Sequence, residues 1–279
     1  MTTATLTGAD LATYRERGQV TPGARIPGAM LARLRAALDR LIEENPRTRP
    51  EHLVLRWGGG LDTLPTHTEF LEVARDPAIL DLVESVLGPD IVLWGAHVFC
   101  KPAGDGLEVP WHQDGQYWPI RPLATCTVWI AIDDSRAENG CMRYIPGSHR
   151  TRTVYHHRVD ERPGLAINQV LREDQFDEAT ACDVELTAGQ LSIHDVYLIH
   201  GSRSNRSAWR RAGFAIRYMP ATSLYDRSLA YQGGAAAIRQ NMAVRPIYLV
   251  RGADRHGGND FMVGHDRPYE VGVPDGAAQ

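Results

Sequence analysis

The chain has few cysteines, and they form no recognisable pattern. Cys100, Cys126, Cys141 and Cys182 stand apart, with no Cys-x-x-Cys pair among them. Zinc sites and redox motifs built on cysteine pairs are therefore not indicated. Scattered reduced thiols are typical of a cytoplasmic protein, and we expect that location for this chain.

Long apolar runs and a strong charge of one sign are also missing. No stretch approaches the roughly 20 apolar residues that cross a bilayer, and the first residues lack the basic and apolar regions of a signal peptide. The formal net charge of −4 argues against a general nucleic-acid binder. We therefore expect neither a membrane nor a nucleic acid among the partners.

The order of the patterns predicts an α+β fold in a single domain, 1–279. Apolar residues at helical spacing indicate helices over 28–45 and 70–87, within a helical buttress of about residues 1–90. Strand-like stretches follow at 91–94, 98–100, 125–132, 190–193 and 214–218. Helices first and then many short strands predict a jelly roll, or double-stranded β-helix, over about 91–220, with 221–279 as a C-terminal extension.

One polar, irregular stretch, 151–182, is too long for a tight connection. It is either a mobile lid over the mouth of the barrel or a surface excursion without function.

The tripeptide His112-Gln113-Asp114 carries most of the chemical information. Residues two apart on a strand point to the same face, so His112 and Asp114 can present a nitrogen and an oxygen to one point. His200, from a distant strand, is the candidate third donor. Two histidines and one carboxylate leave three positions open on an octahedral ion, which is diagnostic of non-haem Fe(II) oxygenases. A further histidine, His194, we interpret as a packed or hydrogen-bonding residue.

An arginine downstream of His200 supports this interpretation. Residues 214–218 read as a strand, and its return beside the strand of His200 would place an arginine within reach of the metal. A buried guanidinium is costly unless it meets an anion, and it suits a bidentate carboxylate. This pairing is what 2-oxoglutarate requires, because its keto-acid end chelates iron and its far carboxylate needs a cation.

Several motifs in order give the chain a family resemblance. They span roughly residues 90–220 and are Trp111-His112-Gln113-Asp114, Thr127-Val128-Trp129-Ile130-Ala131-Ile132-Asp133-Asp134, Glu138-Asn139-Gly140-Cys141-Met142, Ile145-Pro146-Gly147-Ser148-His149, and Ile199-His200-Gly201-Ser202 through Arg211. With these motifs the chain resembles the phytanoyl-CoA dioxygenase family of Fe(II)- and 2-oxoglutarate-dependent oxygenases.

The resemblance implies roles for particular residues. His112, Asp114 and His200 would be the catalytic iron ligands. Arg211 would bind 2-oxoglutarate, with Arg210 as the alternative if the register slips by one. If loss of Arg211 left the 2-oxoglutarate requirement unchanged, the role would move to Arg210 or Arg217. Trp129 and His97 would line the cosubstrate pocket. Halogenating relatives replace the carboxylate by Ala or Gly, whereas this chain keeps Asp114, which favours oxygen insertion.

Residues close to the metal pair are the candidates for substrate binding. They are Gln116, Tyr117, Trp118, Arg121 and, if its segment folds over the barrel mouth, Arg56. Two arginines there would favour an anionic substrate that carries a carboxylate or phosphonate. Alternatively, Arg121, just before Pro122, only holds a loop or a salt bridge.

The implied enzyme is a hydroxylase that uses Fe(II), 2-oxoglutarate and O2. It would oxidise an unactivated C–H bond of a small molecule, release succinate and CO2, and exist as a monomer or homodimer. The same cofactors could instead support desaturation, epimerisation or cyclisation of a natural-product intermediate. A third hypothesis is a metal-binding cupin without oxygenase activity, either an isomerase or a binding module.

Overall fold

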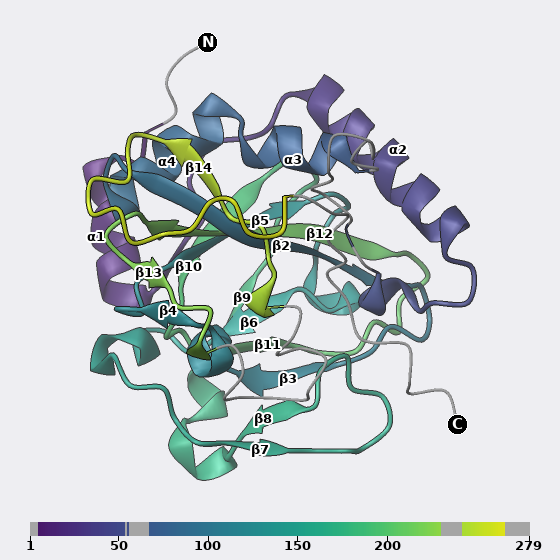
Figure 1. Cartoon of the computed structure of the whole chain (residues 1–279). Helices are drawn as coiled ribbons and strands as arrows, with labels where there is room; N and C mark the ends of the chain where they lie inside the picture. Colours follow the sequence, from purple (N-terminus) through teal and green to yellow (C-terminus); the bar gives the residue numbers. More distant parts are fainter. Residues whose placement is uncertain (1–4, 54, 56–66, 230–241, 266–279) are drawn as a thin grey trace.

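Two antiparallel β-sheets that face each other form the centre of the protein (Figure 1). The computed structural model describes residues 5–53, 55, 67–229 and 242–265. The larger sheet has the strand order β1-β10-β5-β12-β2-β14, and the smaller sheet has the order β3-β11-β6-β9. This arrangement confirms the predicted α+β class with a jelly-roll core.

The strand bounds show how distant segments meet in each sheet. The larger sheet contains β1 (Gln19–Val20), β2 (Ile91–Lys101), β5 (Cys126–Ala131), β10 (Leu191–Asp195), β12 (Arg211–Pro220) and β14 (Tyr248–Arg251). The smaller sheet contains β3 (Val109–His112), β6 (Met142–Tyr144), β9 (Cys182–Val184) and β11 (His200–Ser202). Two short pairs complete the set, β4 (Ile120–Arg121) with β13 (Leu224–Tyr225) and β7 (His157–Val159) with β8 (Gln169–Leu171).

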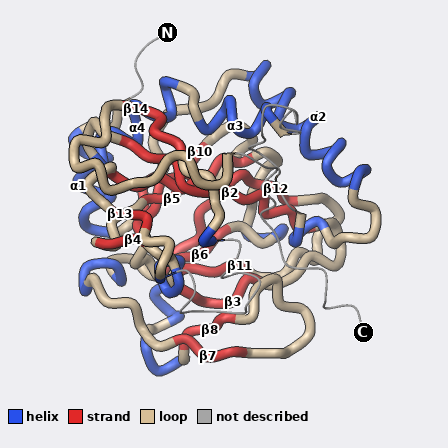
Figure 2. The backbone as a smooth tube through the Cα atoms, viewed as in Figure 1, coloured by secondary structure: helices blue, strands red, loops and turns tan. Residues whose placement is uncertain are grey.

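In the described part of the chain, α-helices accompany the sheets, and α2, α3 and α4 lie on the side of the larger sheet away from the smaller one (Figures 1 and 2). The helices are α1 (Gly8–Arg17), α2 (Gly28–Glu44), α3 (Thr68–Ala74) and α4 (Pro77–Leu87), with 3-10 turns η1 (Pro50–His52), η2 (Asp114–Tyr117), η3 (Ala137–Asn139), η4 (Ser148–Thr151), η5 (Glu173–Gln175) and η6 (Glu178–Thr180). Apolar side chains of the helices and of the sheet's outer face form one buried core, in which Phe70 and Phe214 meet edge to face at 5.1 Å. The helices therefore buttress the sheet, as predicted.

The prediction of one helix over 70–87 is wrong, because the chain breaks at Arg75-Asp76. Asp76 caps α4 by accepting hydrogen bonds from the amides of Ala78 and Ile79, and Pro77 occupies the first turn. An N-cap aspartate followed by proline is a strong helix start. The helix predicted over 28–45 is confirmed as α2, whose buried Leu34, Leu38 and Leu41 follow helical spacing.

The two strand segments predicted at 91–94 and 98–100 form one continuous strand, β2. Apart from His97 and Phe99, its residues are buried, so no alternation of apolar and polar residues marks it as a single strand. β14 from the C-terminal extension pairs with its first half. The extension therefore adds an edge strand to the larger sheet.

The 151–182 segment lies at the outer side of the smaller sheet. Its strands β7 and β8 pair with each other, and β8 lies against β3 (bottom of Figure 1). Backbone hydrogen bonds join Glu108 to Gly164 and Ala166 at 2.9 and 2.7 Å. Whether this segment moves as a lid stays a prediction.

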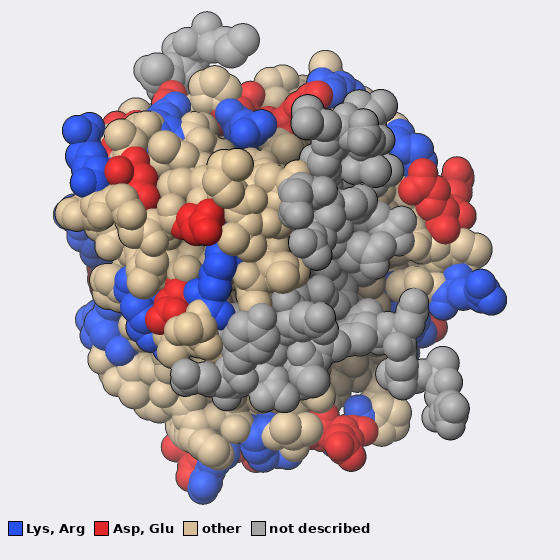
Figure 3. All heavy atoms as spheres, in the orientation of Figure 1, with Lys and Arg blue, Asp and Glu red and all other residues tan. Residues whose placement is uncertain are grey.

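Surface charges are mixed in sign. Figure 3 shows acidic and basic side chains next to one another on one face of the molecule. Arg251, for example, pairs with Asp81 and Glu84 at 2.7 and 2.8 Å. None of the described helices is both long and apolar enough to cross a bilayer.

Candidate functional site

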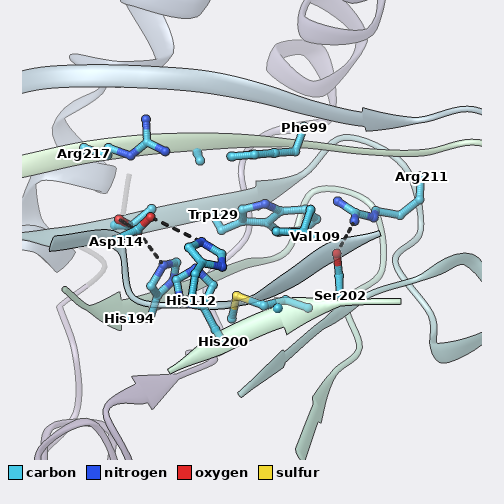
Figure 4. A pocket seen from close by; sticks show the side chains of 14 residues that line it. Phe99, Val109, His112, Asp114, Trp129, His194, His200, Ser202, Arg211 and Arg217 are labelled. Atoms are coloured by element: carbon cyan, nitrogen blue, oxygen red, sulfur yellow. Dashed lines mark hydrogen bonds and ion pairs between the residues drawn. The ribbon is translucent and has the colours of Figure 1, made fainter. Parts of the chain in front are cut away.

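A cavity lies between the two sheets (Figure 4). The register of the larger sheet explains which side chains enter it. Arg217, Thr127 and His194 are paired neighbours on β12, β5 and β10. Two residues before Arg217 on β12, Ala215 pairs with Trp129 of β5. Arg211, the first residue of β12, points to the same face as Ala215 and Arg217. The cavity is therefore lined by successive rows of one sheet face, opposite the smaller sheet.

Three potential metal donors meet in this cavity. His112 ends β3 and His200 begins β11, and the two residues are direct cross-strand partners with ring centroids 4.2 Å apart. Asp114 lies in η2, but the extended backbone of Gln113 continues the strand alternation and turns the carboxylate to the same side. One donor atom from each residue lies within 4.8 Å of the other two. The set could hold a metal ion, because donors bound to one ion must lie this close together.

Backbone carbonyls fix the orientation of both histidine rings. The Nδ1 atom of His112 contacts the Pro110 carbonyl at 2.8 Å, and that of His200 contacts the Leu198 carbonyl at 2.9 Å. Each Nδ1–H therefore donates to a carbonyl, and each Nε2 is left with a lone pair for the cavity. Burial, with the repulsion of the neighbouring ring, lowers the pKa of His200 to about 3, and burial also lowers the pKa of His112. Both rings are thus held in the neutral form that binds metals.

Asp114 is held as a carboxylate in spite of its burial. Burial alone would raise its pKa, but His194, His200 and the cationic Arg217 hold that pKa well below the usual value. Its Oδ1 lies 3.8 Å from His112 Nε2, and its Oδ2 lies 3.4 Å from the Thr127 hydroxyl. The site therefore presents one negative charge to an incoming cation.

His194 enters the cavity, although its sequence position predicted only a packed or hydrogen-bonding residue. It is 2% exposed, and its Nε2 lies 3.6 Å from Asp114 Oδ2 (Figure 4). Neither ring nitrogen has a hydrogen-bond partner among the described residues. Strand parity from β10 was the available signal, but the turn between His194 and His200 hid their relative position. His194 is thus a neighbour of Asp114 rather than a member of the three-donor set.

Arg211 lies at the other end of the cavity and is 3% exposed (Figure 4). Its Nη2 donates to the Gly140 carbonyl at 2.8 Å and contacts the Ser202 hydroxyl at 3.4 Å. Its Nε has no partner among the described residues, and burial lowers the pKa of the guanidinium to about 10. A buried cation with an unused donor is the complement of a carboxylate ligand.

The prediction that Arg211 lies on a strand beside that of His200 is wrong. It lies on β12, which pairs with β2 and β5 in the larger sheet, whereas His200 lies in the smaller sheet. The arginine therefore faces the metal donors across the barrel instead of from an adjacent strand. Its neighbour Arg210 points elsewhere and pairs with Asp133 and Asp39 at 2.8 and 2.7 Å.

Trp129 forms the wall between the two ends of the cavity. The Arg211 guanidinium lies 5.6 Å from the centre of its ring. Gly213 makes room for that ring, because a Cβ atom there would lie 1.9 Å from Trp129 Cζ2. His97, the other predicted cosubstrate residue, does not line the cavity; Phe99 does, and the two rings are 4.5 Å apart.

The predicted substrate residues are only partly gathered here. Gln116 and Tyr117 lie in η2, and the Gln116 amide contacts Gln169 Oε1 of β8 at 3.3 Å. Trp118 is buried and meets Trp94 edge to face at 4.4 Å. Arg121 is exposed and does not line the cavity. It donates to the carbonyls of Trp118 and Ile120, which is the loop-holding alternative. Arg56 lies outside the described residues.

Comparison with known proteins agrees with this geometry. A family model described as phytanoyl-CoA dioxygenase matches residues 14–213, which is well over half of the chain. The chain belongs to the phytanoyl-CoA dioxygenase family.

The proteins that resemble this chain differ in the reactions that their names give. A probable alpha-ketoglutarate-dependent hypophosphite dioxygenase from Stutzerimonas stutzeri is 32% identical over 152 residues, which cover 53% of this chain and 52% of that protein. Among solved structures, the non-heme monooxygenase ThoJ is 29% identical, with a TM-score of 0.64 and coverage of 87% and 84%. The alpha-ketoglutarate-dependent epimerase SnoN from nogalamycin biosynthesis is 25% identical, with a TM-score of 0.57 and coverage of 78% and 84%. The chain spans about half the length of the curated relatives it matches.

Proposed function

We propose that this protein is an Fe(II)- and 2-oxoglutarate-dependent oxygenase of small molecules. His112, Asp114 and His200 would bind the iron, and Arg211 would bind the far carboxylate of 2-oxoglutarate. The observation that carries the proposal is the placement of Arg211 in the same cavity as the three donors. Among the described residues its Nε has no hydrogen-bond partner, and Asp114 is the one carboxylate that lines the cavity, so a bound dicarboxylate would supply the missing anion.

The other residues of the cavity fit this role. Trp129, Phe99, Met142 and Val109 give it apolar walls between the metal donors and Arg211. Such walls exclude water and strengthen the ion pair between Arg211 and a carboxylate. The Ser202 hydroxyl beside Arg211 offers the same carboxylate a further donor. The chain thus orients the cosubstrate, while iron with 2-oxoglutarate and O2 supplies the oxidation of a C–H bond with release of succinate and CO2.

The proposed reaction is hydroxylation of a small, anionic molecule. Retention of Asp114 supports it, because a carboxylate at this position occupies a place that a halide would otherwise take. The likeness to an epimerase structure favours a second candidate, in which the same site epimerises, desaturates or cyclises its substrate. Incorporation of 18O from 18O2 into the product would identify hydroxylation. A product without 18O that has lost hydrogen or has an inverted stereocentre would identify the second candidate.

Succinate release tests the proposal directly. His112→Ala and Asp114→Ala should each abolish 2-oxoglutarate-dependent succinate formation, whereas His156→Ala, at an exposed histidine, should leave it unchanged. Formation of succinate at the wild-type rate by either site variant would refute the ligand assignment. Tight metal binding without any consumption of 2-oxoglutarate would instead support a metal-binding cupin.

A further inference from the structure

A second arginine, Arg217, enters the cavity on the opposite side of the metal donors from Arg211. The two residues lie on the same face of β12, six positions apart. Figure 4 shows them at the two ends of the view, with Asp114 below Arg217 and with His112, His200 and Trp129 between the two arginines. Arg211 is assigned to the cosubstrate, so Arg217 faces the remaining space around the metal donors.

Aromatic rings hold this guanidinium in place. Its Cζ lies 5.2 Å from the centre of the Trp118 ring and 6.0 Å from that of Trp94. These two rings contact each other and belong to a buried apolar cluster that also includes Tyr225 and Met242. Stacking on rigid aromatic rings restricts a long side chain, so less conformational freedom is lost when it binds a ligand.

A third arginine, Arg245, approaches the same place from the segment that precedes β14. Its Cζ lies 5.6 Å from the Trp94 ring, and the side chain is buried. Gly95 makes this approach possible, because a Cβ atom there would lie 2.9 Å from Arg245 Nη1. Gly95 is also the β2 partner of Arg217. Two guanidinium groups from separate segments therefore converge over one glycine.

The electrostatics of the neighbouring residues agree with a local positive potential. His97 lies on the same face of β2 as Gly95, and burial together with Arg217 and, more weakly, Arg245 lowers its pKa to about 3. His52 also contributes to this lowering. Asp114 is the one carboxylate among the described lining residues, and a bound cation would engage it. The charges of these described residues therefore favour an anion beside Arg217.

We propose that Arg217, supported by Arg245, binds an anionic group of the substrate and so determines its specificity. This inference rests on the proposed function and names the substrate class as small molecules that carry a carboxylate, phosphonate or phosphate. The anion would lie against Arg217, which is on the Asp114 side of the metal, and the oxidised carbon would lie close to that anionic group. The inference moves the anion-binding role from Arg121 and Arg56, predicted from sequence, to Arg217.

The test compares two arginine variants. Binding of acetate, methylphosphonate and the neutral isostere acetamide is measured by calorimetry on anaerobic protein saturated with Fe(II) and 2-oxoglutarate, so that Arg211 is occupied. We expect wild-type protein to bind at least one of the two anions and to bind acetamide more weakly. Arg217→Gln should weaken anion binding at least tenfold, Arg217→Lys should retain part of it, and the matched control Arg121→Gln should leave it unchanged.

Two results would overturn the inference. One is equal anion affinity in wild-type protein and Arg217→Gln, and the other is wild-type protein that binds neither anion better than acetamide. Failure of the proposed function is seen separately, because Fe(II) and 2-oxoglutarate would then give no visible absorption band. In that case the same titrations are made in an Arg211→Gln background, where binding at Arg211 cannot be mistaken for binding at Arg217.

Discussion

At the scale of single residues, Arg211 and Arg210 show how one position in register changes a side chain's role. Arg211 is buried in the cavity without an ion-pair partner among the described residues, whereas Arg210 pairs with the half-buried Asp133 and the exposed Asp39. We expect Arg211→Gln to weaken the productive binding of 2-oxoglutarate by about 2–5 kcal/mol, as for a buried ion pair that loses one partner. Arg210→Gln removes a partly buried, bidentate pair with Asp133, so it should lower stability and leave the 2-oxoglutarate requirement unchanged. The KM for 2-oxoglutarate in a succinate assay distinguishes them, and equal KM values in the two variants would contradict the assignment.

Gly213 offers a second prediction at this scale. In Gly213→Ala the added methyl group would overlap the Trp129 ring, which must then move into the space between the metal donors and Arg211. We expect the affinity for 2-oxoglutarate to fall at least tenfold, with a smaller effect on metal affinity. Gly23→Ala is the matched control, because a Cβ atom there meets no other atom within 4 Å. Unchanged 2-oxoglutarate binding in folded Gly213→Ala protein would show that Trp129 does not border the cosubstrate.

At the scale of elements, Gln113 ties the turn that carries Asp114 to two other segments. Its amide nitrogen donates to the carbonyls of Thr153 and Tyr197 at 3.0 and 2.7 Å, and its amide oxygen accepts from the Tyr155 amide at 2.7 Å. Tyr197 lies just before β11, so the Gln113 side chain connects the end of β3 to the segment that leads into His200. Gln113 is therefore a positioning residue for the metal donors.

Gln113→Leu should loosen this junction. We expect a 10- to 100-fold loss of Fe(II) affinity, roughly as for other residues that orient metal ligands. Gln116→Leu, in the same turn, serves as the control, because the Gln116 amide contacts only Gln169 among the described residues. Metal titration under nitrogen gives both affinities, and an equal loss in the two variants would mean that Gln113 acts only through general stability.

His157 makes the same junction sensitive to acid. Its Nε2 accepts a hydrogen bond from the backbone N–H of Gln113 at 2.9 Å, and its Nδ1 contacts the Tyr155 carbonyl at 2.9 Å. Burial lowers the pKa of His157 from 6.5 to about 4. Between those values the unfolded chain binds more protons than the folded one, so stability falls as pH drops from 6.5 towards 4. In urea unfolding, His157→Gln should be less stable than wild type at pH 7.5 by about 1 kcal/mol. It should also lose less stability between pH 7.5 and 5; an identical loss would contradict this role.

The sequence predicted the elements better than their junctions. Helical spacing was enough for α2, and the tripeptide around Gln113 was enough for the pairing of a histidine with a carboxylate. The helix break at Asp76-Pro77 was missed because the helical spacing of apolar residues continues through it. The Asp-Pro pair, which is typical of a helix start, could have predicted the break. The positions of Arg217 and His194 depend on long-range register across β12, β5 and β10, which no local pattern contains. The position of Arg245 depends on how the segment before β14 packs over Gly95 of β2.

At the scale of the whole molecule, the site depends on the packing of two sheets whose inner faces both line the cavity. The smaller sheet supplies His112 and His200, and the larger sheet supplies Arg211, Trp129 and Arg217. The helices cover the outer face of the larger sheet and leave its inner face to the cavity (Figure 1). The two histidines proposed to bind metal and the two arginines proposed to bind anions therefore come from opposite sheets, so the proposed chemistry requires the assembled barrel.

Anaerobic absorption spectroscopy tests this account most directly. Adding Fe(II) and then 2-oxoglutarate to the purified protein should produce a weak visible band of the iron–keto-acid chelate. The band should be lost in Asp114→Ala and should require much more 2-oxoglutarate in Arg211→Gln. Wild-type protein that binds Fe(II) but shows no band at saturating 2-oxoglutarate would contradict a metal centre and a cosubstrate site in one cavity.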